Sequence, residues 1–175
     1  ALHNWFREFY PYSPLVFTGF SLGGAMAASA ACALNEGPYV ALAPCLSSLT
    51  AEAMCDGAIS LNISWSSLGG SRGGEQETRE QLYQLADRFG VQAVIDSNPV
   101  NRVGSLHQLV ASEDVIVDER FGEALYQALA KRTSTSLPNS YACLETIPGG
   151  HGTAMIAAGQ SFGPAIIRAL EHLSP

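Results

Sequence analysis

The chain has 175 residues, of which 47% are hydrophobic and 14% are charged, and this composition fits one compact, well-buried domain. Its net charge of -7, with no basic cluster longer than Lys131-Arg132, argues against nucleic acid or anionic lipid headgroups as partners. No run of 18 apolar residues is present, so the sequence predicts no transmembrane helix.

Short β-rich apolar runs alternate along the chain with segments whose apolar residues recur at helical spacing. This alternation predicts an α/β fold with a mostly parallel sheet of about four strands and helices on both faces. The strands are expected at 15–18, 39–43, 106–111 and 141–147, and the helices at 2–10, 24–34, 75–89, 119–132 and 159–173.

Two features interrupt this pattern between the second and third strands. Pro44 is expected to end the second strand, because proline supplies no backbone N–H. Residues 46–74 then mix serine, glycine and short apolar pieces, and their glycine-rich end, 69–74, is typical of a loop. No linker divides the chain, so residues 1–175 are expected to form a single domain.

The four cysteines form no Cys-x-x-Cys pair and have no histidine at metal-ligand spacing, so no metal site is expected. Buried reduced thiols are favoured, and a Cys45–Cys55 disulfide is the alternative. The cysteines are Cys32, Cys45, Cys55 and Cys143.

Ser21 lies in Gly19-Phe20-Ser21-Leu22-Gly23, between the first strand and the alanine-rich helix. A sharp strand-to-helix turn can expose a serine nucleophile there, and such a turn would crowd side chains at Gly19 and Gly23. Gly24 and Ala25 would let the helix approach the sheet, and the Leu22 N–H would point at a developing oxyanion. The alternative is a plain turn in which Ser21 is a helix N-cap.

A serine nucleophile needs a base and an orienting acid, and both residue types follow later strands. Asp114 lies in the loop beyond the third strand, and His151 lies in a glycine-rich loop beyond the fourth. The order serine, aspartate, histidine is the one that this architecture requires. Glu113 and Asp118 are rivals for the acid.

The other three histidines, His3, His107 and His172, fall in a helix, a strand and the terminal helix. We interpret all three as structural or solvated residues rather than members of a catalytic site.

The segments 19–24, 112–117 and 149–152 resemble the three signature loops of the alpha/beta-hydrolase superfamily. More narrowly, 43–48, 109–114 and 147–163 resemble the group typified by alpha/beta-hydrolase domain-containing protein 18. The superfamily resemblance spans residues 15–173. It implies a partial alpha/beta-hydrolase fold in which residues 46–105 form a cap-like insertion that sets substrate selectivity.

The same resemblance implies roles for the site residues. Ser21 would be the nucleophile, His151 the general base and then acid, and Asp114 the orienting carboxylate, with the Leu22 N–H at the oxyanion. The expected reaction is hydrolysis or transfer of an acyl group of carboxylic esters, lipid esters among them, without metal or organic cofactor.

The position of Ser21 departs from the family pattern, because the nucleophile of a complete hydrolase follows several earlier strands. The strand at 15–18 is therefore expected to have an open edge that another protein chain covers, and one oxyanion donor would come from elsewhere. Three explanations stay open: a carboxyl-terminal part of a longer protein, one half of a two-chain fold, or a non-catalytic subunit of an assembly.

Overall fold

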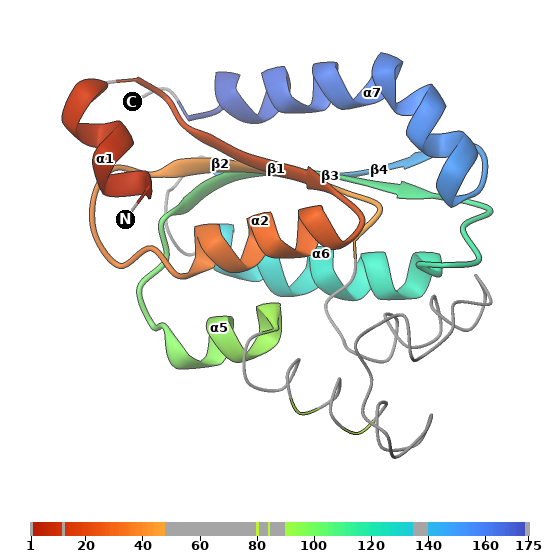
Figure 1. The fold of residues 1–175 in the computed structure, drawn as a ribbon, viewed down its shortest axis with the longest axis horizontal. Coiled ribbons are helices and arrows are strands. Elements are labelled where there is room, and N and C mark those ends of the chain that lie inside the picture. Colours follow the sequence, from red (N-terminus) through yellow and green to blue (C-terminus); the bar gives the residue numbers. More distant parts are fainter. Residues whose placement is uncertain are drawn as a thin grey trace, which may run out of the picture.

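A computed structural model describes residues 2–11, 13–47, 80, 84, 90–134 and 140–173. Its sheet has four parallel strands in the order β1-β2-β3-β4 (Figure 1), so the expected parallel sheet of about four strands is confirmed. In a parallel sheet the carboxyl ends of all strands meet at one edge, where the loops carrying Ser21, Asp114 and His151 begin. The strands are β1 (Val16–Phe20), β2 (Val40–Cys45), β3 (Val103–Ala111) and β4 (Tyr141–Ile147).

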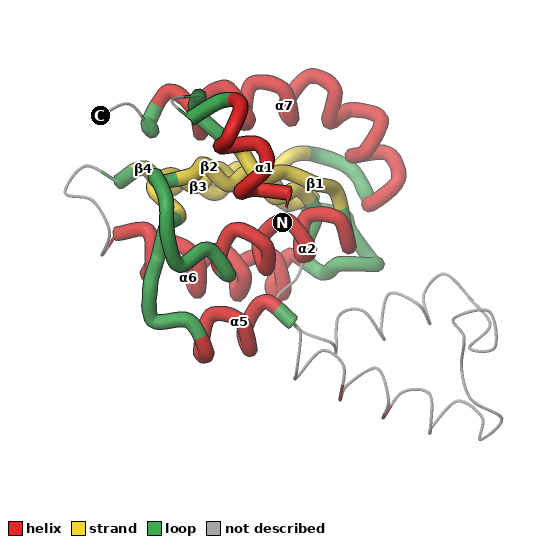
Figure 2. The backbone as a smooth tube through the Cα atoms, turned by 60° about the vertical axis from the view of Figure 1, so that its left-hand side comes forward, coloured by secondary structure: helices red, strands yellow, loops and turns green. Residues whose placement is uncertain are grey.

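Helices cover both faces of the sheet (Figure 2). One face carries α2, α5 and α6, the other carries α7, and α1 lies at the end where the chain enters β1. No helix among the described residues is long and apolar enough to cross a bilayer. The helices are α1 (Leu2–Phe9), α2 (Leu22–Cys32), α5 (Val91–Ser97), α6 (Glu119–Ser134) and α7 (His151–Glu171).

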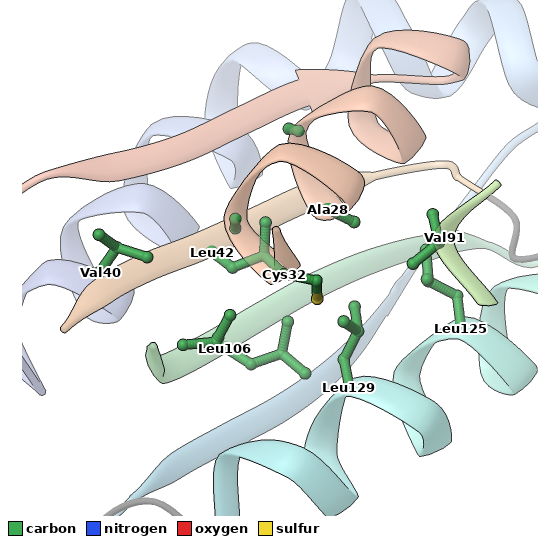
Figure 3. Packing of buried hydrophobic residues seen from close by; sticks show 11 residues of the cluster. Ala28, Cys32, Val40, Leu42, Val91, Leu106, Leu125 and Leu129 are labelled. Atoms are coloured by element: carbon green, nitrogen blue, oxygen red, sulfur yellow. The ribbon is translucent and has the colours of Figure 1, made fainter. Parts of the chain in front are cut away.

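The largest cluster of buried side chains fills the space between the sheet and the α2, α5, α6 layer (Figure 3). Every residue of β2 and β3 is buried, because these strands are central and covered on both faces. Burying a large aliphatic side chain contributes about 1.5–3 kcal/mol, so this cluster holds the three helices against the sheet. Its largest members include Leu42, Leu106, Leu125 and Leu129.

Strand β2 continues through Pro44 instead of ending before it. Pro44 lies opposite Gly19 of β1, and Cys45 still pairs with both neighbouring strands. The loss of one N–H donor is therefore tolerated where the flanking residues remain paired on both sides.

Two helices differ from the sequence prediction. Helix α5 was not expected, and its Val91 packs into the main cluster with residues of α2. The last helix begins at His151 rather than Gly159, so the glycines within it do not prevent the helix. Of the helix predicted at 75–89, Glu80 and Gln84 are described, and both are helical and exposed.

The predicted insertion at 46–105 is described only in part, because residues 48–79 lie outside the described residues. Residues 103–105 are the first three of β3, and α5 packs against the main body of the fold. A cap-like role for the remainder stays a prediction.

Three of the cysteines are described, and all three are free thiols, as expected; Cys55 lies outside the described residues. Burial raises the pKa of Cys32 to about 11, and burial together with the nearby Asp114 charge raises the pKa of Cys45 to about 12. Both thiols are therefore protonated at neutral pH and are poor nucleophiles.

His107 is fully buried on β3 and has both ring nitrogens occupied, which fits the structural role expected for it. Nδ1 lies 2.7 Å from the Tyr141 hydroxyl and Nε2 lies 2.9 Å from Glu145. Glu145 also accepts a hydrogen bond from Arg168 of α7, and the Tyr141 ring stacks on His172 just beyond α7. This group fastens α7 to the sheet. The side chain of His3 lies outside the described residues.

Candidate active site

Ser21 is the single residue between β1 and α2, and its backbone has φ 53° and ψ −123°. A residue other than glycine rarely adopts positive φ, and such strain is found where the surrounding structure imposes it, often at functional sites. Ser21 occupies the N-cap position, but its side chain makes no capping hydrogen bond. The hydroxyl lies instead 2.9 Å from Nε2 of His151. The N-cap alternative therefore does not account for this side chain.

The turn requires glycine at Gly19 and Gly24 but not at Gly23. A Cβ on Gly19 would lie 2.3 Å from the Gly23 carbonyl oxygen, and one on Gly24 would lie 1.9 Å from the Ser47 hydroxyl. A Cβ on Gly23 would meet nothing within 4 Å. The expected crowding is thus found at Gly19 and is wrong for Gly23, since the close approach of helix to sheet falls at Gly24.

These glycines give a matched pair of variants. Gly24→Ala is expected to lower the free energy of unfolding by about 1–3 kcal/mol, because the new methyl group also lies 2.8 Å from the backbone oxygen of Gly19. Gly23→Ala meets open space and is expected to be neutral or to stabilise by up to about 1 kcal/mol through helix propensity. Urea unfolding of both variants measures the difference, and equal stabilities would contradict the packing described.

His151 is the first residue of α7, directly after the loop that ends β4. Gly149 has φ 102°, which a residue with a side chain would adopt only with strain. The Thr153 hydroxyl accepts a hydrogen bond from the Gly150 N–H, which secures the helix start. The ring of Phe20 meets the imidazole edge-on, with centroids 5.3 Å apart. The start of α7 and the contact with Phe20 together orient the imidazole of His151.

Asp114 is buried in the loop after β3 and faces His151. Its Oδ2 lies 2.7 Å from Nδ1 of His151, and its Oδ1 accepts hydrogen bonds of 2.8 Å from the N–H groups of Ile116 and Val117. Three hydrogen bonds thus hold the carboxylate in one orientation.

The two rival carboxylates lie elsewhere. Glu113 is exposed, and its backbone N–H bonds to the Gly149 carbonyl. Asp118 accepts from the N–H of Arg120 at the start of α6. Asp114 is therefore the acid that meets His151.

Ser21, His151 and Asp114 form a continuous hydrogen-bonded chain, although they follow three different strands. His151 connects the other two, with 14% of its side chain exposed, whereas the Asp114 side chain is fully enclosed. With Asp114 accepting from Nδ1–H, Nε2 carries the lone pair that can accept the Ser21 proton. The arrangement can activate the hydroxyl for attack on a carbonyl carbon.

Leu22 is the first residue of α2, so its N–H lies in the helical turn whose N–H groups have no partner within the helix. The N–H groups of Gly24 and Ala25 are occupied by the Ser21 carbonyl. The described residues include no group of three His, Cys, Asp or Glu side chains that could hold a metal ion.

Sequence reasoning assigned no role to two residues of this site. Phe20, which contacts His151, carries no signal beyond being the aromatic residue before the serine. Ser47 lies within a stretch that carries the family resemblance, but nothing in the sequence links it to Ser21.

Comparison with known proteins places these features in context. The family model described as "Alpha/beta hydrolase domain containing 18" matches residues 1–98. No curated protein sequence matches the chain significantly.

Two solved structures share the fold at low sequence identity. The Pyrococcus furiosus esterase Pf2001 superposes with a TM-score of 0.56 and 14% identity, over 97% of this chain and 60% of its own. A puromycin-hydrolysing peptidase from Mycobacterium tuberculosis gives a TM-score of 0.57 and 16% identity, over 99% of this chain and 25% of its own. The chain therefore spans about 60% of the length of the esterase and a quarter of that of the peptidase.

Proposed function

The chain belongs to the alpha/beta hydrolase domain containing 18 family, and on this premise we propose that it carries the catalytic centre of a serine ester hydrolase. The observation that supports this most directly is the hydrogen-bonded chain Ser21–His151–Asp114. In this proposal the substrate is a carboxylic ester, and the reaction proceeds through an acyl-serine intermediate.

In the first half-reaction the Ser21 hydroxyl oxygen attacks the ester carbonyl carbon while its proton passes to Nε2 of His151. Asp114 stabilises the imidazolium that forms, and the Leu22 N–H donates to the carbonyl oxygen as it becomes negatively charged. When the tetrahedral intermediate collapses, the bond to the leaving alkoxide breaks and His151 returns the proton to it. The product alcohol departs and the acyl group remains on Ser21.

In the second half-reaction a water molecule attacks the acyl carbon and gives its proton to His151. Collapse of this second intermediate breaks the bond to Ser21, and the serine oxygen recovers a proton from His151. The carboxylic acid leaves, and the enzyme returns to its starting state.

Labelling with a fluorophosphonate probe tests this function directly. The expected result is a single covalent adduct whose mass maps to the peptide that contains Ser21, formed by the native protein and not after heat denaturation. An adduct on another serine, or no adduct on the complete protein with all its natural partners, would overturn the proposal.

Exposed apolar side chains next to the site residues favour an apolar acyl group. Leu22 follows Ser21 and is 54% exposed, and Val115 follows Asp114 and is 77% exposed. We expect kcat/KM for 4-nitrophenyl esters to rise from acetate to octanoate, because each additional buried CH₂ contributes about 0.8 kcal/mol. Hydrolysis rates over this series provide the measurement, and a preference for acetate would exclude lipid-like esters.

The free edge of β1 supports the proposal that another strand, from a longer chain or a second protein, completes the site. Among the described residues β1 pairs only with β2, and on the adjoining α2 the large apolar side chains of Leu22 and Met26 are exposed. A covering strand would bury this edge and could bring a second oxyanion donor. If the fluorophosphonate probe does not label the protein even when the covering strand is present, the alternative is favoured. In that alternative the chain is a non-catalytic subunit that keeps the hydrolase fold.

A further inference from the structure

Ser47, two residues beyond the end of β2, contacts the turn that carries Ser21. Ser47 is 1% exposed, and its hydroxyl oxygen lies 2.9 Å from the carbonyl oxygens of both Ser21 and Cys45. One hydroxyl has one proton, so it donates to one of these carbonyls at a time. The Cys45 carbonyl also accepts a hydrogen bond of 2.8 Å from the Ser21 N–H. When the Ser47 hydroxyl donates to Ser21, both backbone polar groups of Ser21 are hydrogen-bonded to residues at the end of β2.

The hydrogen bond between Ser47 and Ser21 lies beside two residues with strained backbone conformations. Ser21 has φ 53° and Leu46 has φ 49°, and these are the only residues other than glycine with positive φ among the described ranges. Leu46 is itself anchored, since its N–H donates to the Leu109 carbonyl of β3. Because positive φ persists only where neighbouring contacts impose it, the hydroxyl of Ser47 is one of the contacts that hold the turn.

The packing around Ser47 leaves room for its hydroxyl and little more. Gly24 faces it, and a Cβ on Gly24 would lie 1.9 Å from the Ser47 oxygen and 3.1 Å from its Cβ. The absence of a side chain at Gly24 thus lets the Ser47 hydroxyl come within 2.9 Å of the Ser21 carbonyl oxygen.

The Ser21 carbonyl and the Leu22 N–H belong to one planar peptide group. The Ser21 carbonyl also accepts hydrogen bonds from the N–H groups of Gly24 and Ala25, and the Ser47 hydroxyl adds a donor from outside the helix. Together these bonds set the direction of the Leu22 N–H, and each polarises the peptide group and strengthens the N–H as a donor. We propose that Ser47 is a positioning residue that orients the Leu22 N–H towards the oxyanion. This inference rests on the proposed function, and it adds a residue that touches neither the substrate nor the reacting atoms.

The kinetic consequence differs from that of a purely structural residue. Ser47→Ala is expected to lower kcat and the rate of fluorophosphonate labelling at Ser21 by about 10- to 100-fold with little change in KM. The loss is smaller than for a deleted oxyanion donor, because the N–H remains but is misdirected. Ser47→Cys keeps a donor without adding a further methyl group to this closely packed site, and it is expected to recover part of the labelling rate.

An activity-independent readout separates this inference from the proposed function. In ¹H–¹⁵N spectra, Ser47→Ala is expected to shift the Leu22 amide resonance, and Ser47→Cys to return it part of the way towards the wild-type position, while the amides of β3 stay unchanged. An unmoved Leu22 resonance in Ser47→Ala would overturn the inference even if the wild-type protein is labelled. An absence of labelling in the wild-type protein would overturn the function.

Folding controls complete the test. Should Ser47→Ala fail to fold, Ser47→Cys retains the volume with a weaker donor, and its labelling rate is expected to fall between those of Ser47→Ala and wild type. A Ser47→Cys protein that folds and labels at the wild-type rate would overturn the positioning role.

Discussion

Ser21→Ala and His151→Ala, singly or together, are expected to lower kcat by the same factor, about 10⁶-fold. The physical reason is that the hydroxyl and the imidazole act as one unit. Without the base the hydroxyl is a poor nucleophile, and without the hydroxyl the base has no proton to accept. The 2.9 Å contact between Ser21 Oγ and His151 Nε2 is the geometry on which this depends.

Ester hydrolysis by the complete protein measures this non-additivity, with probe labelling in parallel. His172→Ala provides a matched control, because His172 lies just beyond the other end of α7 and is exposed. The control is expected to keep the wild-type rate. A double variant much slower than either single variant, or an active His151→Ala, would show that the two side chains act separately.

The proximity of Ser21, Asp114 and His151 could be predicted because parallel strands bring the loops at their carboxyl ends together. Strand β4 was predicted at its observed bounds, and the predicted end of β3 at Ala111 is also as observed. Once those ends are known, the residues just beyond them must lie at the same edge as Ser21. Local apolar pattern was therefore sufficient to select Asp114 and His151 as candidates.

What the sequence did not predict depends on contacts between distant segments. The helix of His151 was placed eight residues too late, because Gly149, Gly150 and Gly152 around His151 are typical of a loop. Tertiary contacts stabilise this helix: the Ser105 hydroxyl donates to the Ala169 carbonyl, and Arg168 reaches Glu145.

The contact of Ser47 with Ser21 was also not predicted, because it is a single hydrogen bond between distant segments. Ser47 lies 26 positions from Ser21, and its partner is a backbone carbonyl, which no side-chain pattern marks. Gly24 is the residue in the sequence that reflects this contact, because a larger side chain there would collide with Ser47. That requirement can be recognised only once the structure shows the two segments in contact.

Asp114→Asn is expected to lower kcat by about 10⁴-fold, although it changes one atom and leaves the shape of the site intact. The aspartate Oδ1 accepts two backbone N–H groups, so the asparagine oxygen must take that position. Its NH₂ group would then face Nδ1 of His151, donor against donor, and the imidazole would carry its proton on Nε2 instead. In that tautomer the nitrogen facing Ser21 has no lone pair.

Glu113→Gln is the matched control for this substitution, because it makes the same change of charge one residue away on an exposed side chain. Glu113→Gln is expected to retain the wild-type rate. If Asp114→Asn lowers kcat only by changing the tautomer of His151, both variants are expected to unfold at similar urea concentrations. Since the carboxylate of Asp114 sits 2.7 Å from Nδ1 and that of Glu113 does not reach it, equal activities of the two variants would remove Asp114 from the mechanism. If activity is lost only in Asp114→Asn, the carboxylate of Asp114 determines which ring nitrogen of His151 carries the proton.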